Sequence, residues 1–201
     1  MKRISISVTG VLRDVLSKLI SLNNKYNECE FEGDLPDLDL VKHLNFKDDE
    51  ELIKFMYVDC PLQLFGYSGE IEEGISFVEL NNFYKKYRDE YKIVLVSEEV
   101  EKSKPATLVF LAKHGCLIDT IEFYPINKSH IIWDKTDIFL TCEDGVLIKK
   151  PKDKTSIKFK NKYNKHIESD FTIKSIKELS KIIDGDKYRY QFDIKIIDEN
   201  K

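Results

Sequence analysis

The stretch from residue 4 to residue 14 constrains the fold more than any other part of the chain. A run rich in β-branched side chains reaches Thr9, Gly10 follows as a turn residue, and an apolar-periodic segment begins at Val11. A strand that passes through a tight turn into a helix opens a parallel α/β sheet, which places its ligands at the carboxyl ends of its strands. The opening therefore predicts an α/β protein with a candidate site around Gly10.

The rest of the sequence alternates strand-like and helix-like patterns. Continuous apolar runs indicate buried parallel strands, and apolar residues three or four positions apart indicate helices. This alternation predicts a parallel sheet with right-handed crossovers, followed by one half-exposed strand at 188–197, where polar and apolar residues alternate. The other predicted strands are 92–97, 120–124 and 137–142, and the predicted helices are 11–26, 38–57, 76–87, 105–114 and 173–183.

Charge and cysteine usage narrow the class of protein. Lys and Arg number 32 against 36 Asp and Glu, which gives a net charge of −4 and no basic field to attract nucleic acid. The four cysteines form no CxxC motif, so reduced structural thiols are expected rather than disulfides. No apolar run approaches the roughly 18 residues of a membrane span, and the N-terminus leads into a strand rather than a signal peptide. We expect a soluble protein without nucleic-acid or membrane partners.

Four short motifs, taken in order, resemble those of one known family. The segment ISISVTGVLRD is similar to the first motif of the haloacid dehalogenase (HAD) superfamily, in its nucleotidase-like phage and bacterial branch. In that branch the first strand typically runs into DxDGVLRD. Ser7 therefore stands at the position of the nucleophilic aspartate, and Thr9 stands at that of the acid/base aspartate.

The later motifs follow in the family's order. KIVLVS resembles the second motif and places Ser97 to bond a phosphoryl oxygen. Lys128 is the best candidate for the lysine that offsets phosphoryl charge. DIFLTC aligns with the fourth motif, hhhhDD, and puts Thr141 and Cys142 at the two aspartates that hold Mg²⁺ in relatives.

The resemblance implies a Rossmann-like, three-layer α/β fold of HAD type, with a parallel sheet, a small cap insert and an extra C-terminal strand. The implied single domain has its core at about residues 1–26 and 75–185 and its cap at about 27–74. The added strand, at about 187–198, lies outside the usual HAD core.

The replaced residues do not suit HAD chemistry, which forms an aspartyl-phosphate beside Mg²⁺. Ser7 would need a nearby base, and Thr9 cannot act as one at neutral pH. Magnesium requires hard, anionic oxygen ligands, and a thiol is the wrong type of ligand. The sequence therefore predicts no catalytic residues, no metal and no cofactor. The vestigial positions are Ser7, Thr9, Ser97, Lys128, Thr141 and Cys142.

Several residues have two interpretations. A register shift would return Glu143 or Asp144 to the strand end as a metal ligand, or else these residues and Gly145 form an acidic turn. Arg13 either binds an anion through both guanidinium nitrogens or lies on the surface of a first helical turn. Cys142 is either a reactive thiol or a buried, inert one.

Ligand binding also has competing interpretations. Strand-end hydroxyls and the backbone N–H groups after Gly10 would form an anion pocket, or else the hydroxyls pack without any ligand. The lysine-rich stretch 149–165 either contacts an acidic partner or a phosphate backbone, or it is a solvated face. The four histidines show no metal-ligand spacing. The candidate ligand-binding residues are Ser7, Thr9, Gly10, Arg13, Ser97 and Lys128.

Three functions from different classes are open. The first is a catalytically inactive HAD-like interaction module, a component of a phage capsid, portal or tail assembly, whose partners are other proteins. The second is a Mg²⁺-dependent, 5′-nucleotidase-like phosphatase with displaced carboxylates. The third is an anion-binding protein without turnover. Function depends on the site rather than on the fold, and the aspartates of this site are replaced. The first function is therefore favoured, and the protein is expected in the host-cell cytoplasm or the virion.

Overall fold

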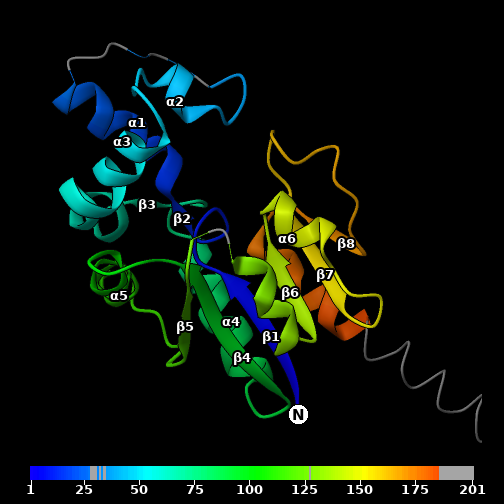
Figure 1. The fold of residues 1–201 in the computed structure, drawn as a ribbon. Coiled ribbons are helices and arrows are strands. Elements are labelled where there is room, and N and C mark those ends of the chain that lie inside the picture. The colour runs from blue at the N-terminus through cyan, green and yellow to red at the C-terminus, as the bar shows by residue number, and fades with distance from the viewer. Residues whose placement is uncertain (28–30, 32, 34, 127, 186–201) are drawn as a thin grey trace, which may run out of the picture.

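A central parallel sheet organises the structure, a computed structural model that describes residues 1–27, 31, 33, 35–126 and 128–185. The sheet has six strands in the order β5-β4-β1-β6-β7-β8 (Figure 1). Strand β1 lies inside it and pairs in parallel with β4 and β6. The strands of the sheet are β1 (Lys2–Ser7), β4 (Tyr91–Glu98), β5 (Ile121–Tyr124), β6 (Ile138–Thr141), β7 (Thr155–Phe159) and β8 (Phe171–Ile173).

Helices cover both faces of the sheet, which gives three layers. Alternate residues of β4 show this: Ile93 and Leu95 pack in the cluster that includes α4 and residues 176–183, whereas Val94 and Val96 pack against η3 and α6. A strand buried on both faces has a nearly continuous apolar sequence, as KIVLVS has. The helices of the core are α4 (Ser76–Tyr87), α5 (Ser103–Lys113), η3 (Ser129–Asp134), α6 (Asp144–Ile148), η4 (Ile176–Glu178) and the segment 179–185.

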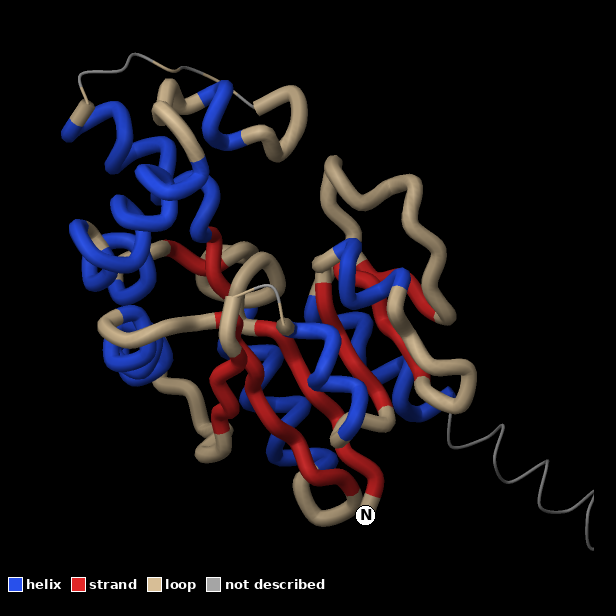
Figure 2. Tube along the Cα trace, in the orientation of Figure 1, coloured by secondary structure: helices blue, strands red, loops and turns tan. Residues whose placement is uncertain are grey.

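The described residues between 15 and 66 form a helical unit, which we call the cap. It has its own apolar cluster, and it lies beyond the carboxyl end of β1 (Figure 2). Two short antiparallel strands, β2 (Arg13–Asp14) and β3 (Gly69–Glu70), flank the cap in the sequence and join it to the core. The helices of the cap are α1 (Val15–Tyr26), α2 (Leu40–His43), α3 (Asp49–Lys54), η1 (Phe55–Asp59) and η2 (Leu62–Gly66).

The α/β fold and most core elements are as predicted. The helix at 76–87 and the strands at 92–97, 120–124 and 137–142 are confirmed, to within two residues at each end. Gly115 follows α5 with a φ of +63°, as expected of a glycine that ends a helix. No helix among the residues described is long and apolar enough to cross a membrane.

Two predicted helices of the N-terminal part are wrong in extent. Helix α1 begins at Val15 rather than at Val11, because Asp14 pairs with β3 and its carboxylate caps the helix by accepting from the Ser17 N–H at 3.1 Å. The segment 38–57 is not one helix. Asn45 has a φ of +60° between α2 and α3 and so interrupts it.

The C-terminal third differs more from the prediction. The acidic turn at 143–145 is wrong, because Asp144 begins α6. Strands β7 and β8 were not predicted. The helix predicted at 173–183 begins later, because residue 173 belongs to β8 and the helical residues start with η4 at Ile176. Strand β7 was missed because its lysines suggest an exposed segment. Lys158 is in fact buried, and its ammonium donates to the carbonyls of Asn164 and Ile167. The strand predicted at 188–197 lies outside the described residues.

Candidate functional site

The turn after β1 depends on Gly10. Its φ of +74° lies in the left-handed region, which glycine adopts without steric cost. A Cβ at this position would lie 2.3 Å from the Cys142 Sγ, so the thiol packs directly against the glycine. Burial raises the pKa of the Cys142 thiol to about 12, which keeps it protonated at neutral pH and favours an inert side chain over a reactive one.

The hydroxyl at the aligned nucleophile position is bonded inside the protein. Ser7 Oγ donates to Thr141 Oγ1 at 3.0 Å across the paired strands β1 and β6. The exposed fractions of the two residues are 3% and 0%. Thr141 Oγ1 also accepts from the Glu143 N–H at 3.2 Å. Thr9, at the aligned acid/base position, accepts from Arg13 Nη2 at 2.8 Å. Ser7 and Thr141 therefore bond each other, Thr9 bonds Arg13, and none of these hydroxyls bonds a carboxylate.

Arg13 is fully buried, so its interpretation as a surface residue is wrong. Its Nη2 donates to Glu99 Oε1 at 2.6 Å. Its Nη1 donates to the Phe65 carbonyl at 3.1 Å and to the Thr107 hydroxyl. The rings of Phe65 and Phe110 flank the guanidinium, with centroids 4.9 and 5.5 Å from its Cζ. The charge that was a candidate for ligand binding is neutralised within the fold.

Glu99 was missed by the sequence analysis although it holds this site together. Its Oε1 accepts from Arg13, from Ser97 Oγ at 2.9 Å and from the Thr107 hydroxyl. Ser97 therefore bonds Glu99 rather than standing free for a phosphoryl oxygen. The available signal was the acidic pair that directly follows KIVLVS, because side chains just after a parallel strand lie at the ligand-binding edge of the sheet.

A tyrosine from the cap reaches this edge. The pKa of Tyr57 is raised by burial and then by the charges of Glu99, Glu98 and Glu143, whereas Arg13 lowers it. The phenol is therefore within electrostatic reach of the strand ends of both β4 and β6. The Tyr57 ring packs against Phe65 of the cap, with centroids 5.1 Å apart.

A cavity of about 350 Å³ lies beside these bonded residues, and Glu143 lines it. Burial and the charge of Glu98 raise the pKa of Glu143 to about 7, while a hydrogen bond from Ser129 opposes the shift. His130 and Lys149 also line the cavity, so it carries both signs of charge. Glu143 is the one predicted metal candidate that faces a cavity at the strand ends; Asp144 instead lies 3.6 Å from the His166 ring.

We expect the Glu143→Gln variant to be more stable than the wild type above neutral pH and equally stable near pH 4.5. The native pKa of about 7 exceeds the ordinary value of 4.5, so the native state binds more protons and the wild type loses stability as pH rises through this interval. Partial exposure limits the loss to about 1–2 kcal/mol. Urea unfolding of both proteins across this pH range measures it. Equal stabilities above neutral pH would show that Glu143 is solvated.

The strand-end residues do not fit the magnesium ion that the fold family implies. Ser7 donates its proton to Thr141, and the Cys142 thiol points at Gly10. The buried carboxylate of Glu99 already has a counter-charge in Arg13. Hard anionic oxygens are what Mg²⁺ needs, and the aligned positions supply none. Among the described residues there is also no cluster of three or more His, Cys, Asp or Glu arranged to hold a metal.

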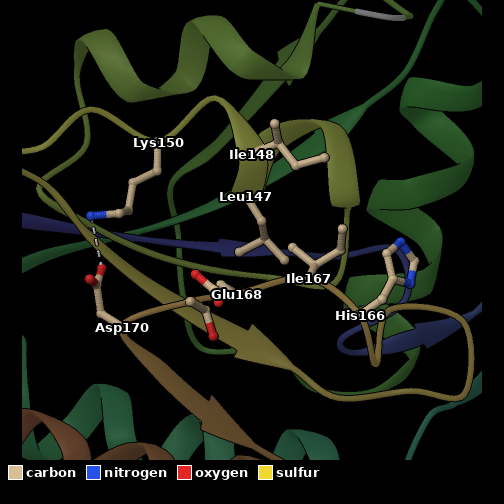
Figure 3. A pocket seen from close by; sticks show the side chains of 8 residues that line it. Leu147, Ile148, Lys150, His166, Ile167, Glu168 and Asp170 are labelled. Atoms are coloured by element: carbon tan, nitrogen blue, oxygen red, sulfur yellow. Dashed lines mark ion pairs between the residues drawn. The ribbon is translucent and has the colours of Figure 1, made fainter.

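The predicted lysines lie elsewhere. Lys128 is exposed, and its backbone N–H donates to Glu98 Oε1 at 3.1 Å. In the lysine-rich stretch, Lys150 lies 3.1 Å from Asp170 at one end of a groove of about 460 Å³ (Figure 3). Lys154 lies 3.3 Å from Asp137. Internal pairing reduces the charge that this stretch would present to an acidic partner.

Solved structures identify the fold. A dehalogenase structure matches with a TM-score of 0.55 and 12% identity, over 90% of this chain and 96% of that one. A structure described as a haloacid dehalogenase-like hydrolase from Burkholderia xenovorans LB400 matches with a TM-score of 0.53 and 12% identity, over 89% of this chain and 95% of that one. No profile of a known protein family and no curated protein matches the sequence. The chain has the fold of the haloacid dehalogenase superfamily.

Proposed function

We propose that this chain is a non-hydrolytic HAD-fold protein that acts as a binding module for other proteins. The observation that carries the proposal is the hydrogen bond between Ser7 and Thr141, which stand where an aspartyl-phosphate site needs its nucleophile and a metal-binding carboxylate. Each hydroxyl is buried and bonded to the other. A place in a phage capsid, portal or tail assembly stays a prediction from the sequence.

The chemistry supports this proposal over serine catalysis. A serine nucleophile requires a base within hydrogen-bond reach to take its proton. The acceptor of the Ser7 proton is the hydroxyl of Thr141, which is far too weak a base at neutral pH. The buried carboxylate of Glu99 has Arg13 as its counter-ion and accepts no hydrogen bond from Ser7.

A second candidate function is hydrolysis that uses Glu143. A carboxylate with a pKa of about 7 in a cavity at the strand ends has the property of a general acid or base. The solved structures with this fold include dehalogenases and a hydrolase, which supports a search for turnover. In this candidate Glu143 would activate water, and Lys149 would bind an anionic group of the substrate.

We expect the wild type to release no phosphate from p-nitrophenyl phosphate or nucleoside monophosphates above the buffer rate, with or without added Mg²⁺. The reason is the missing carboxylate at position 7, since losing a nucleophile removes many orders of magnitude of rate. The assay compares the wild type with Glu143→Gln and with the double variant Ser7→Asp/Thr9→Asp.

The matched control is Asp144→Asn, which changes an adjacent acidic residue that pairs with His166 at 3.6 Å. Turnover by the wild type that Glu143→Gln abolishes and Asp144→Asn keeps would overturn the non-hydrolytic proposal and establish the second candidate. Turnover by the wild type that both variants keep would also overturn the non-hydrolytic proposal. It would in addition exclude Glu143 as the catalytic group.

A further inference from the structure

The Arg13 cluster joins parts of the protein that are far apart in sequence. Arg13 belongs to β2, the first connection between core and cap. Its Nη1 donates to the carbonyl of Phe65, in the cap helix η2, and to the hydroxyl of Thr107, in the core helix α5. Its Nη2 donates to Glu99, just after the core strand β4. One guanidinium therefore bonds core and cap at the same time.

The two helices that meet at this cluster are also in close backbone contact. A Cβ on Gly66 of η2 would lie 3.3 Å from the Ala106 carbonyl oxygen of α5. Ala106 packs within the apolar cluster of the cap, although it belongs to the core. A cap that swings away would expose this apolar contact and take the Phe65 carbonyl and ring from the buried Arg13 guanidinium, which is costly for buried groups.

We propose that Arg13 clamps the cap helix η2 to the core helix α5. The two helices then unfold locally only as one unit, and the cap does not swing away from the core as a hinged lid. The clamp sits at the connecting strand itself, where a hinge would need its freedom. Access to the strand ends is then limited to space that already exists, such as the cavity beside Glu143. The inference concerns motion and stands whether or not the chain hydrolyses anything.

Native-state hydrogen exchange of the full chain tests the clamp. We expect amides of η2 and α5 in the wild type to show one common opening free energy and the same dependence on urea. In Arg13→Lys, which keeps the charge but cannot reach all these partners, exchange of both helices should quicken together by about tenfold or more. Exchange of β1 and β4 should quicken by no more than the loss of global stability, which urea unfolding of the same variant measures.

The matched control is Lys113→Ala. Lys113 also bridges the same region, with its ammonium 5.9 Å from the Tyr67 ring, but it does so at the surface. We expect no change in exchange of either helix. Separate opening of η2 in the wild type would overturn the proposal, and so would an Arg13→Lys variant whose η2 and α5 exchange as in the wild type. Because the first measurement needs only the wild type, misfolding of the variant cannot hide the answer.

Discussion

Glu99→Leu is expected to lower the free energy of unfolding by about 3–5 kcal/mol, because it leaves a buried arginine without its counter-charge. Arg13 and Glu99 lie 2.6 Å apart, and both side chains are fully buried. The substitution also removes the acceptor of Ser97 and Thr107. Urea unfolding followed by circular dichroism measures the loss as a lower midpoint with an unchanged slope.

A double variant separates the loss of a partner from the loss of a charge pair. Arg13→Met/Glu99→Leu removes both charges and places a flexible apolar chain between the rings of Phe65 and Phe110. It should be less destabilised than Glu99→Leu alone. As a surface control, Lys54→Ala breaks an exposed pair with Asp59 and should cost less than about 1 kcal/mol. A similarly small cost for Glu99→Leu would contradict the burial of the pair.

The sheet core could be predicted from the sequence because several local signals indicate the same elements. KIVLVS is apolar on both faces and is bounded by charged residues, so nothing except a central parallel strand suits it. The helix α4 repeats apolar residues at helical spacing and buries Phe77, Leu80 and Phe83. Local pattern and tertiary packing agree for these elements, and their bounds were correspondingly accurate.

Elements that depend on distant partners could not be predicted from local patterns. Strand β2 exists because Arg13 and Asp14 meet Glu70 and Gly69, which lie more than fifty residues later in the chain. Strand β7 carries Lys158 in a buried position, where a pattern that scores lysine as exposed places a loop. Only the loop carbonyls that accept from its ammonium explain the burial.

The same limit applies to the site. The absence of aspartates at the aligned positions was visible in the sequence, whereas what replaced them was not. The pairing of Ser7 with Thr141 follows from the adjacency of β1 and β6, which the order of strands in the chain does not reveal. The partner of Arg13 was equally hidden, since Glu99 follows a different strand. Ligand binding by these residues stays a prediction.

Gly10→Ala is expected to be the other strongly destabilising substitution, with a loss of about 2–5 kcal/mol in the free energy of unfolding. Two costs add: an alanine with a φ of +74° is strained, and its Cβ would meet the Cys142 Sγ at 2.3 Å. Gly74→Ala is the matched control, because Gly74 has a φ of +67° and no atom within 4 Å of its Cβ position. That control should lose only the conformational part, about 1–2 kcal/mol.

Removing the Cys142 thiol should restore the part of the unfolding free energy that Gly10→Ala loses beyond the loss in Gly74→Ala. In Gly10→Ala/Cys142→Ala the contact that remains is with the Cys142 Cβ position, at an ordinary 3.7 Å, so the double variant should approach Gly74→Ala in stability. Thermal or urea unfolding of the wild type, Gly10→Ala, Cys142→Ala and the double variant completes the cycle. If Gly10→Ala were no worse than Gly74→Ala, the thiol would not fill the space beside the turn. That space would then be open to a ligand, and the proposal of a non-hydrolytic site would lose one of its supports.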